Sequence, residues 1–441
     1  MKKRAIFILM SLLLLVNITT TTFALDTSFD NPVPINKVWT IKFNLPLDTS
    51  TINSNTVYIT DSSSKTFSIK YEFEDRDKTL KVIPIGNFQF SSEYFLHIEN
   101  VKSKSGKILK EPFRMRFITE EASEDAKVQA RKEEIQQRYD ALKSQLNKSQ
   151  QIFDEKASYV YPYNAGTLNS AFINDGLLMT NFIRFLAYLN DNVQMLDDWN
   201  IKAQHAAALN MINDTLTHFP TKPSDMSDDF YELGAEGART SNIYWGYDDL
   251  EKTIIRYMSD SDRSNIDTVG HRRWIINPYM EYVGFGYAYT EGSYFPNVYS
   301  AMKVFDNQHN TVWGKKGDFD FIAWPSQVAF PIEFFDDHDP WSVSLNHEVY
   351  DNTKIGDIKV TLNNLTLNKK WTFTKEDLNE MQSNKFYNID TGLYGIPFCI
   401  IFRPDNISYN DGDVYEVTIE NIYDKQGQKI QIKYRTVTAG V

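Results

Sequence analysis

Two long stretches of this sequence alternate apolar and polar residues with a period of two, and this pattern limits the possible folds most strongly. In the first stretch, residues 26–119, the segments WTIKFNL (39–45) and FSIKYEF (67–73) show the alternation clearly. Such alternation is typical of strands that bury one face. Turn-forming residues such as those at 61–64 separate the segments. The first stretch is therefore predicted to form a β-sandwich.

The second stretch with this pattern covers residues 307–441. Short apolar segments at 341–345, 398–402 and 415–419 again have the length and composition of strands. Gly412-Asp413 supplies a turn before the last of them. We predict a second β-sandwich at the C-terminal end.

Residues 120–156 differ from both stretches. Glu, Lys, Gln, Arg and Ala dominate, and Gly and Pro are absent, which predicts a helix. The apolar residues follow a heptad-like stripe: Val128, Ile135, Tyr139, Leu142 and Leu146. The preferred interpretation is a linker helix that packs its stripe on the next domain. A dimerising coiled coil is the alternative, although its seam would be unusually short.

Residues 157–306 mix helical and strand patterns. Helices are expected at 177–189, 199–216 and 248–258, and strands at 273–276, 282–289 and 301–305. Helices followed by strands within one block predict an α+β domain.

The first 24 residues have the composition of a secretory signal peptide. Lys2, Lys3 and Arg4 precede an apolar run at 5–16, and Thr22-Phe23-Ala24 places small residues at the cleavage positions. An N-terminal anchor helix is the alternative, but the run is short for a bilayer span. We therefore expect a secreted protein, free or non-covalently associated with the cell wall, with no membrane-spanning segment in its mature form.

Composition narrows the class further. The chain of 441 residues has one cysteine, Cys399, which excludes an intramolecular disulfide and a cysteine-rich zinc site. The net charge of −12 becomes −15 without the signal peptide, which argues against a nucleic-acid partner. A secreted chain of this size without disulfides fits a bacterial exoprotein.

The amino-acid sequence of the first β-rich stretch resembles that of a known family. FNLPLDTSTINSNTVYITDSSSK (43–65) and the closing FRMRFITE (113–120) resemble the bacterial Ig-like domain of S-layer and other surface proteins. The resemblance implies an Ig-like sandwich that serves as a spacer or an adhesive module.

Two histidines of the central block lie where predicted helices end. His218 follows the Ala-rich helix, and His271 lies between a helix and a strand. On spacing alone, two ordinary surface histidines remain the simpler interpretation.

The sequence segments around these histidines resemble those of the CAP superfamily of secreted proteins. The matching segments are TNFIRFLAYLND (180–191), NIKAQHAAALNMINDTLTHFP (200–220), TSNIYWG (240–246) and VGHRRWIINPYMEYVGFG (269–286). The resemblance implies an α-β-α sandwich at 157–306 whose cleft holds two histidines and two acidic residues.

That resemblance assigns the site residues. His218 and His271 match the family's histidines, and Asp260, three residues after Tyr257, matches its second acid. Ser241 stands where the first glutamate is expected, and Glu236 is a possible substitute from nearby. Glu236 and Asp260 are thus the candidate catalytic acids, His218 and His271 the candidate zinc ligands, and Ser241, Tyr257 and Asp260 the expected cleft residues.

The functional expectation is a cleft that binds an extracellular ligand, a divalent metal or a cell-wall partner. The alternative is a metal-assisted hydrolase acting on peptide or wall polymer, and the sequence leaves open whether the protein is an enzyme. A purely structural wall protein is a third possibility. Asp336-Asp337-His338-Asp339 is expected to be a solvated loop, with metal binding as its minor interpretation.

Overall fold

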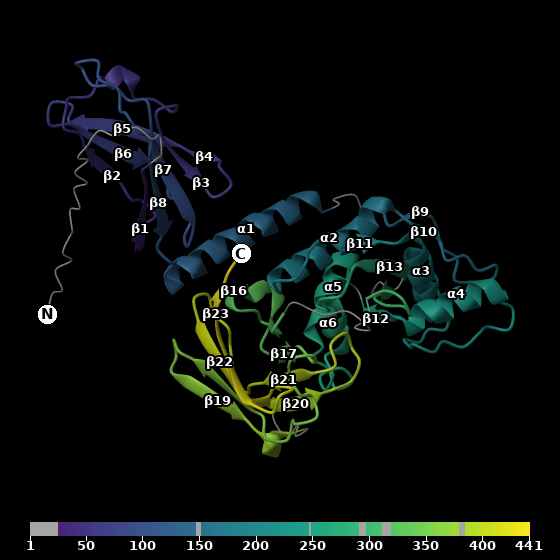
Figure 1. Ribbon diagram of the computed structural model, residues 1–441. Helices are drawn as coiled ribbons and strands as arrows, with labels where there is room; N and C mark the ends of the chain where they lie inside the picture. The colour runs from purple at the N-terminus through teal and green to yellow at the C-terminus, as the bar shows by residue number, and fades with distance from the viewer. Residues whose placement is uncertain (1–24, 147–150, 247, 291–296, 311–318, 379–383) are drawn as a thin grey trace. The chain divides into compact units, whose positions relative to one another are not determined.

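The computed structural model describes residues 25–146, 151–246, 248–290, 297–310, 319–378 and 384–441 (Figure 1). The expected signal peptide, residues 1–24, lies outside the described residues. The chain forms two compact units, Met1–Lys127 and Val128–Val441. Among the described helices, none has the length and apolar character needed to cross a bilayer.

The N-terminal unit is a β-sandwich, as the alternation predicts. Its strands are β1 (Leu25–Val33), β2 (Trp39–Lys42), β3 (Val57–Asp61), β4 (Thr66–Phe67), β5 (Ile69–Glu74), β6 (Thr79–Pro84), β7 (Glu93–Ile98) and β8 (Phe113–Thr119). They form a five-stranded sheet, β1-β8-β7-β3-β4, and a three-stranded sheet, β2-β6-β5. Trp39 and Leu80 of the smaller sheet and Leu96 and Phe117 of the larger one share a buried core.

Helix α1 (Glu124–Gln145) occupies most of the expected linker. Within the second unit, Ile135 and Leu142 of its apolar stripe are buried in the core, and Val128, Tyr139 and Leu146 pack against that core. The stripe is therefore covered by its own unit, as expected for a linker helix, and is not free to join a partner helix.

The central block is built on a mixed four-stranded sheet. The strand order is β11-β13-β14-β12, with bounds Gln194–Met195 for β11, Ser241–Gly246 for β12, Tyr282–Thr290 for β13 and Asn297–Lys303 for β14. A short hairpin, β9 (Phe153–Glu155) and β10 (Thr167–Leu168), precedes it. The helices are α2 (Ser170–Leu186), α3 (Asp197–Ile212), α4 (Asp228–Arg239), α5 (Leu250–Ser259) and α6 (Gly270–Ile275).

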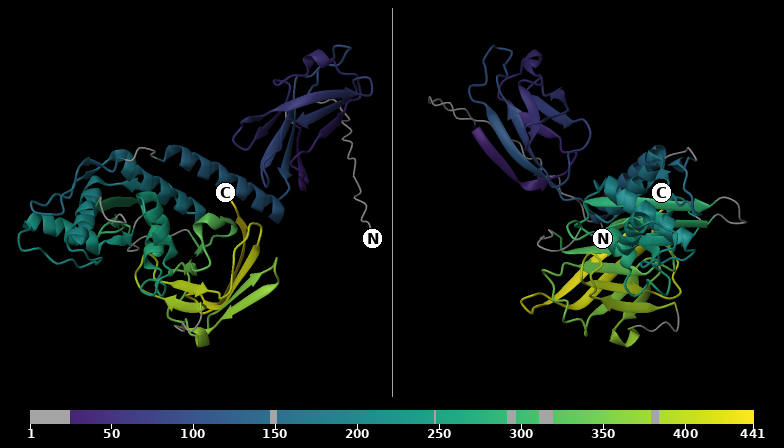
Figure 2. Two further views of the ribbon diagram at one scale, coloured as in Figure 1. Left: turned by 180° about the vertical axis from the view of Figure 1, so that it is seen from behind. Right: turned by 90° about the vertical axis from the view of Figure 1, so that its right-hand side faces the viewer.

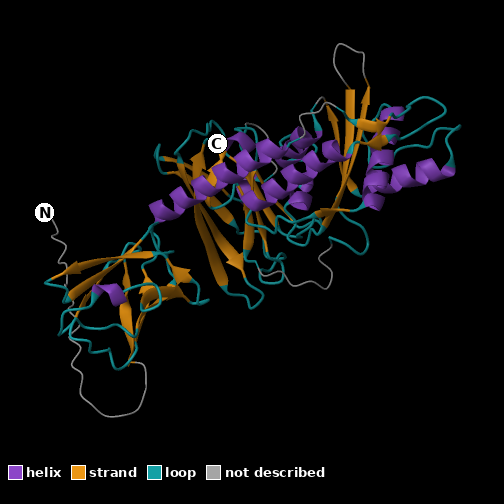
Figure 3. Cartoon of the chain, turned by 90° about the horizontal axis from the view of Figure 1, so that it is seen from above, coloured by secondary structure: helices purple, strands orange, loops and turns teal. Residues whose placement is uncertain are grey.

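Helices cover both faces of this sheet (Figure 3). Helix α3 lies so close to β13 that a Cβ on Gly286 would come within 2.0 Å of the Ala203 carbonyl oxygen. The small side chains of α3 permit this approach, and Ala203 and Ala207 are completely buried. On the other face, Phe285 belongs to the large core that includes α2 and α5.

Two local expectations for the central block were wrong or incomplete. Residues 273–276, expected as a strand, are mostly the second half of helix α6, because a short apolar run has no periodicity that separates a buried strand from a buried helix. Helix α4 was not predicted. The Ser227 hydroxyl caps its N-terminus by accepting a hydrogen bond from the Phe230 amide, but Gly234 and Gly237 weaken the helical signal in its sequence.

The C-terminal block is also a β-sandwich (Figure 2). One sheet has the order β15-β17-β21-β20, and the other has the order β16-β23-β22-β18-β19. The bounds are β15 (Phe321–Trp324), β16 (Val328–Pro331), β17 (Trp341–Leu345), β18 (Lys359–Asn364), β19 (Lys369–Phe373), β20 (Phe386–Asp390), β21 (Cys399–Arg403), β22 (Val414–Tyr423) and β23 (Lys429–Ala439).

One apolar core runs through both the central block and the C-terminal sandwich. Phe285 of the central sheet and Trp341 and Phe402 of the sandwich belong to the same buried cluster. Cys399, the one cysteine of the chain, is also completely buried in the sandwich. The expected boundary near residue 307 therefore does not separate two independent cores.

Two neighbouring arginines of α6 join the blocks through hydrogen bonds. Arg272 donates from Nη1 to the Ser342 hydroxyl at 3.1 Å. Arg273 donates from Nη2 to the carbonyl oxygens of Gly392 and Ile396, both at 2.7 Å. Both arginines are buried, so the sandwich fixes the position of the helix that begins at Gly270.

Candidate functional site

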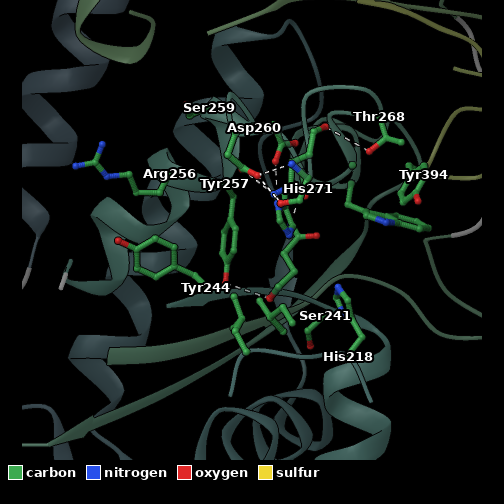
Figure 4. Close-up of a pocket in the computed structure, with 18 of the residues that line it drawn as sticks. His218, Ser241, Tyr244, Arg256, Tyr257, Ser259, Asp260, Thr268, His271 and Tyr394 are labelled. Carbon is green, nitrogen blue, oxygen red and sulfur yellow. Dashed lines mark hydrogen bonds and ion pairs between the residues drawn. The ribbon is translucent and has the colours of Figure 1, made fainter. Parts of the chain in front are cut away.

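A large open cleft, with a cavity volume of about 1140 Å³, lies where the central block meets the C-terminal sandwich (Figure 4). Its walls come from the loop after α3, strand β12, the segment from α5 to α6, and a loop of the sandwich. Five of the six site residues expected from the sequence line it: His218, Ser241, Tyr257, Asp260 and His271. Segments far apart in the sequence thus converge on one cavity.

Asp260 holds His271 in a fixed orientation. The Nδ1–H of His271 donates to Oδ1 of Asp260 at 2.8 Å, and Oδ2 of Asp260 accepts the Arg272 amide at 3.0 Å. The Asp260 side chain is almost completely buried, whereas His271 retains partial exposure. A histidine whose Nδ1 is bound to a carboxylate has its Nε2 left for a ligand or a proton.

His218 is oriented by a backbone carbonyl instead. Its Nδ1 donates to the carbonyl oxygen of Ala238 at 2.7 Å, and Ala238 lies near the end of α4. The loop that carries His218 is held by a 3.4 Å hydrogen bond from the Thr217 amide to Asn210. Both cleft histidines therefore have Nδ1 occupied within the protein, an arrangement also common for histidines that bind metals.

The two histidines have opposite pKa shifts. Removal from water lowers the pKa of His218. Burial also acts to lower the pKa of His271, but the charge and hydrogen bond of Asp260, together with the charge of Asp262, outweigh burial and raise that pKa. Between the two pKa values, the cleft holds a neutral imidazole and an imidazolium, which is the protonation pattern of a base and an acid.

In metal-free buffer, His271 is expected to titrate above about pH 6.5 and His218 below it. Asp260→Asn removes the attraction that raises the pKa of His271 but leaves its burial, so that pKa should fall. Histidine-selective NMR titration of single-histidine-labelled samples measures both values. Because the raised pKa stabilises the fold fully below about pH 6.5 and is lost as the pH rises through the folded value, Asp260→Asn should destabilise most in mild acid.

Asp262→Asn is the matched control, since Asp262 contributes charge but no hydrogen bond to His271. It should lower the pKa of His271 less than Asp260→Asn does. An unchanged His271 pKa in Asp260→Asn would contradict the assigned role of Asp260.

Ser241 and Tyr257 lie deeper in the cleft wall. The Tyr257 hydroxyl donates to the Asn242 carbonyl at 3.1 Å and lies 3.0 Å from the Ser300 hydroxyl, so it supports β12. The Ser241 hydroxyl is buried and has no hydrogen-bond partner among the described residues. An unpaired buried hydroxyl beside a cavity costs free energy that a ligand or water would recover.

The structure places Glu236 outside the cleft. Its Oε1 lies 2.9 Å from Nζ of Lys202 and 4.0 Å from Nζ of the buried Lys303. Glu236 lies on α4, and the neighbouring Gly237 packs against the backbone of α3, so this turn of the helix is held against α3. The expected substitute for the missing glutamate therefore does not take part in the site.

The donor set is incomplete for zinc. Structural zinc has four protein ligands and catalytic zinc three, whereas the cleft offers two free imidazole nitrogens. Over the described ranges, the group of three His, Cys, Asp or Glu side chains close enough to share an ion is Asp336, Asp337 and His338. That group is exposed and lies outside the cleft.

Several cleft residues were not expected from the sequence. Leu393 and Tyr394 come from the C-terminal sandwich, and Phe219 adds exposed apolar surface. The sequence predicts Tyr244, Trp245 and Tyr247 as core and cleft lining rather than a carbohydrate platform. Tyr244 and Trp245 line the cleft, and Tyr247 lies outside the described residues. No local pattern marks Leu393 and Tyr394, because only the shared core brings their loop to the cleft.

Comparisons with known proteins assign the N-terminal unit. Residues 18–119 match the family model of the bacterial Ig-like domain, Big_5. The match stops before the central block. No curated protein matches the chain.

Among solved structures, similarity extends to the bacterial S-layer protein SbsC. Its N-terminal part matches at 18% identity over 19% of this chain and 21% of that chain, with a TM-score of 0.17. Its domains 1–6 match at 10% identity over 95% and 55%, with a TM-score of 0.18. This chain thus spans about half of the longer SbsC structure, and scores of this size establish no common overall fold. What the comparisons establish is that the chain carries a bacterial Ig-like domain at its N-terminal end.

Proposed function

We propose that this protein is a secreted, cell-surface binding protein of a bacterium, in which a CAP domain carries the ligand site. The bacterial Ig-like domain supports a surface location. The three-layer central block and the meeting of His218 and His271 in one cleft support the CAP assignment. The cleft binds a component of the cell wall or of another extracellular polymer.

One observation carries the proposal. His218 and His271 line one large cleft, each with Nδ1 fixed by the protein, and the buried Ser241 hydroxyl beside them lacks a partner among the described residues. Large clefts with a few convergent polar groups among apolar walls are typical of ligand sites. Glu236 forms its ion pair elsewhere, so the carboxylate that would support general-base catalysis in this family is missing.

Cosedimentation with peptidoglycan sacculi from a Gram-positive bacterium tests the proposal. Wild-type protein should bind, and His218→Ala/His271→Ala should bind about tenfold or more weakly, because both groups meet the ligand. The control variant His338→Ala/His347→Ala removes two histidines outside the cleft lining and should bind normally. Equal binding by the cleft variant and the wild type would exclude the cleft as the site.

A hydrolase acting on peptide or wall polymer is the second candidate, favoured by the oppositely shifted pKa values of His218 and His271. The two imidazoles do not complete a zinc site, so the neutral His218 would have to activate water as the general base, with the Asp260-bound His271 as the general acid. Release of dye from labelled sacculi and from labelled casein measures such activity, with and without added zinc. Turnover that His271→Ala abolishes would favour the hydrolase, and absence of turnover in all samples would exclude it for these substrates.

A further inference from the structure

Strand β12 lies at an edge of the central sheet and forms part of the cleft wall. The strand order ends β13-β14-β12, and β14 is the strand with which β12 pairs in the described residues. An edge strand presents backbone N–H and C=O groups that no neighbouring strand uses.

The register identifies these groups. The Val304 amide donates to the Thr240 carbonyl oxygen at 3.1 Å, so this pair is hydrogen-bonded. In an antiparallel ladder, bonded and non-bonded pairs alternate, and Ser241 pairs with Lys303 next in the register. The N–H and C=O groups of Ser241, Ile243 and Trp245 therefore point away from β14, toward the open edge.

The cleft follows this edge. All five residues from Ser241 to Trp245 line it, although successive side chains of a strand point to opposite faces. A cavity lined by five consecutive residues of one strand runs along that strand, and β14 covers its other edge. The outward backbone groups of β12 therefore border the cleft, close to His218 and His271 (Figure 4).

The backbone groups and apolar side chains along β12 are complementary to a polypeptide. A row of backbone donors and acceptors at strand spacing is complementary to another extended chain, and apolar side chains beside such an edge receive its alternate side chains. Phe219 is 77% exposed and Trp245 52% exposed, and both line the cleft. Arg239 at the cleft has no ion-pair partner among the described residues, so it offers a charge for a carboxylate.

We propose that the cleft binds an extended peptide, with an acidic group near Arg239, which adds to β12 as a further strand of the central sheet. This inference rests on the proposed function, because it names the ligand class of the same cleft. The peptide would make hydrogen bonds with Ser241, Ile243 and Trp245 and place its side chains against Phe219 and Trp245.

Two variants at one position separate the backbone contact from the side chain. Trp245→Ala and Trp245→Pro both lose the indole, but only the proline variant also loses the outward N–H. Proline is tolerated on an edge strand when its N–H faces away from the sheet. Circular dichroism and thermal melting verify that both variants fold.

The probes are a synthetic peptide selected from a phage library of random peptides on the wild-type protein, and an oligomer of N-acetylglucosamine. Trp245→Pro should bind the peptide about tenfold more weakly than Trp245→Ala. Hydrogen–deuterium exchange of the wild type should slow in residues 239–246 when the peptide is added. Arg239→Ala should weaken peptide binding more than Arg263→Ala does. Arg263→Ala replaces an exposed arginine outside the cleft lining.

Three outcomes would overturn the inference. Equal peptide affinity of Trp245→Pro and Trp245→Ala would exclude strand addition, even where His218→Ala/His271→Ala shows that the cleft binds the sacculi. Histidine-dependent binding of the glycan oligomer without any peptide binding would assign the cleft to a sugar chain. A doubling of mass in sedimentation that Trp245→Pro abolishes would assign the edge to a second copy of the chain. These outcomes differ from failure of the proposed function. In that case, His218→Ala/His271→Ala would bind the sacculi as well as the wild type does.

Discussion

Gly286→Ala is expected to lower the free energy of unfolding by about 3 kcal/mol. A Cβ at this position would lie 2.0 Å from the carbonyl oxygen and 2.1 Å from the carbonyl carbon of Ala203, and 2.4 Å from the Gln204 nitrogen. All three atoms belong to the backbone of α3, so no side-chain rotation relieves the contact. Either α3 moves away from β13 or the strand bends, and both changes open the packed layer between them. Urea denaturation followed by tryptophan fluorescence measures the loss.

Gly356→Ala is the control for this substitution. An added Cβ there meets no atom within 4 Å, and its backbone is not in the left-handed region. Its stability should stay within about 0.5 kcal/mol of the wild type. A Gly286→Ala protein as stable as Gly356→Ala would show that helix α3 does not need this close approach to the sheet.

Arg272→Ala should destabilise the protein by about 3 kcal/mol, through lost hydrogen bonds and an unfilled space. Its guanidinium donates to the carbonyl oxygens of Met258 at 2.7 Å and Ser259 at 2.8 Å, and to the Ser342 hydroxyl. Burial lowers its pKa, and the charges of Asp339 and Asp260 oppose that shift. Removing the guanidinium leaves buried acceptors without donors on both sides of the junction between the central block and the sandwich.

The control is Arg263→Ala, which removes an exposed arginine from the loop that precedes α6. Thermal melting should show a large decrease for Arg272→Ala and almost none for Arg263→Ala. Peptide or sacculi binding should weaken in Arg272→Ala as well, because His271 is the preceding residue. Unchanged stability of Arg272→Ala would mean that the junction is held by apolar packing alone.

The sequence predicts individual β-strands best where one face of the sheet is buried. The segment 341–345 was expected as a strand and is β17, and the alternation at 67–73 lies in β4 and β5. Helix α6 was missed because Ile275 and both arginines of this short helix are buried, so its polar and apolar residues do not follow a helical period. The shared core was missed because Arg272 and Arg273 look like surface residues until their acceptors across the junction are known.

Some residues of the candidate site could likewise be predicted from the sequence, and others depend on tertiary packing. His218, His271 and Asp260 follow from a family resemblance whose spacing survives in this chain, and the structure brings them to one cleft. Glu236 was proposed from closeness in sequence to Ser241, but the packing of α4 on α3 directs it to Lys202. Leu393 and Tyr394 depend on the approach of a distant loop, and the open edge of β12 depends on strand order. Neither property is encoded in a local pattern.

The completely buried Cys399 allows opening motions of the C-terminal sandwich to be followed by the rate at which its thiol reacts. Burial raises the pKa of this thiol, and only an exposed thiolate reacts rapidly with a disulfide reagent. Each modification event therefore records one opening of the C-terminal sandwich. Because the chain has no second thiol, the time course belongs to a single residue. Ligand that closes the cleft against Leu393 and Tyr394 would slow the reaction, and an assay for binding then needs no label.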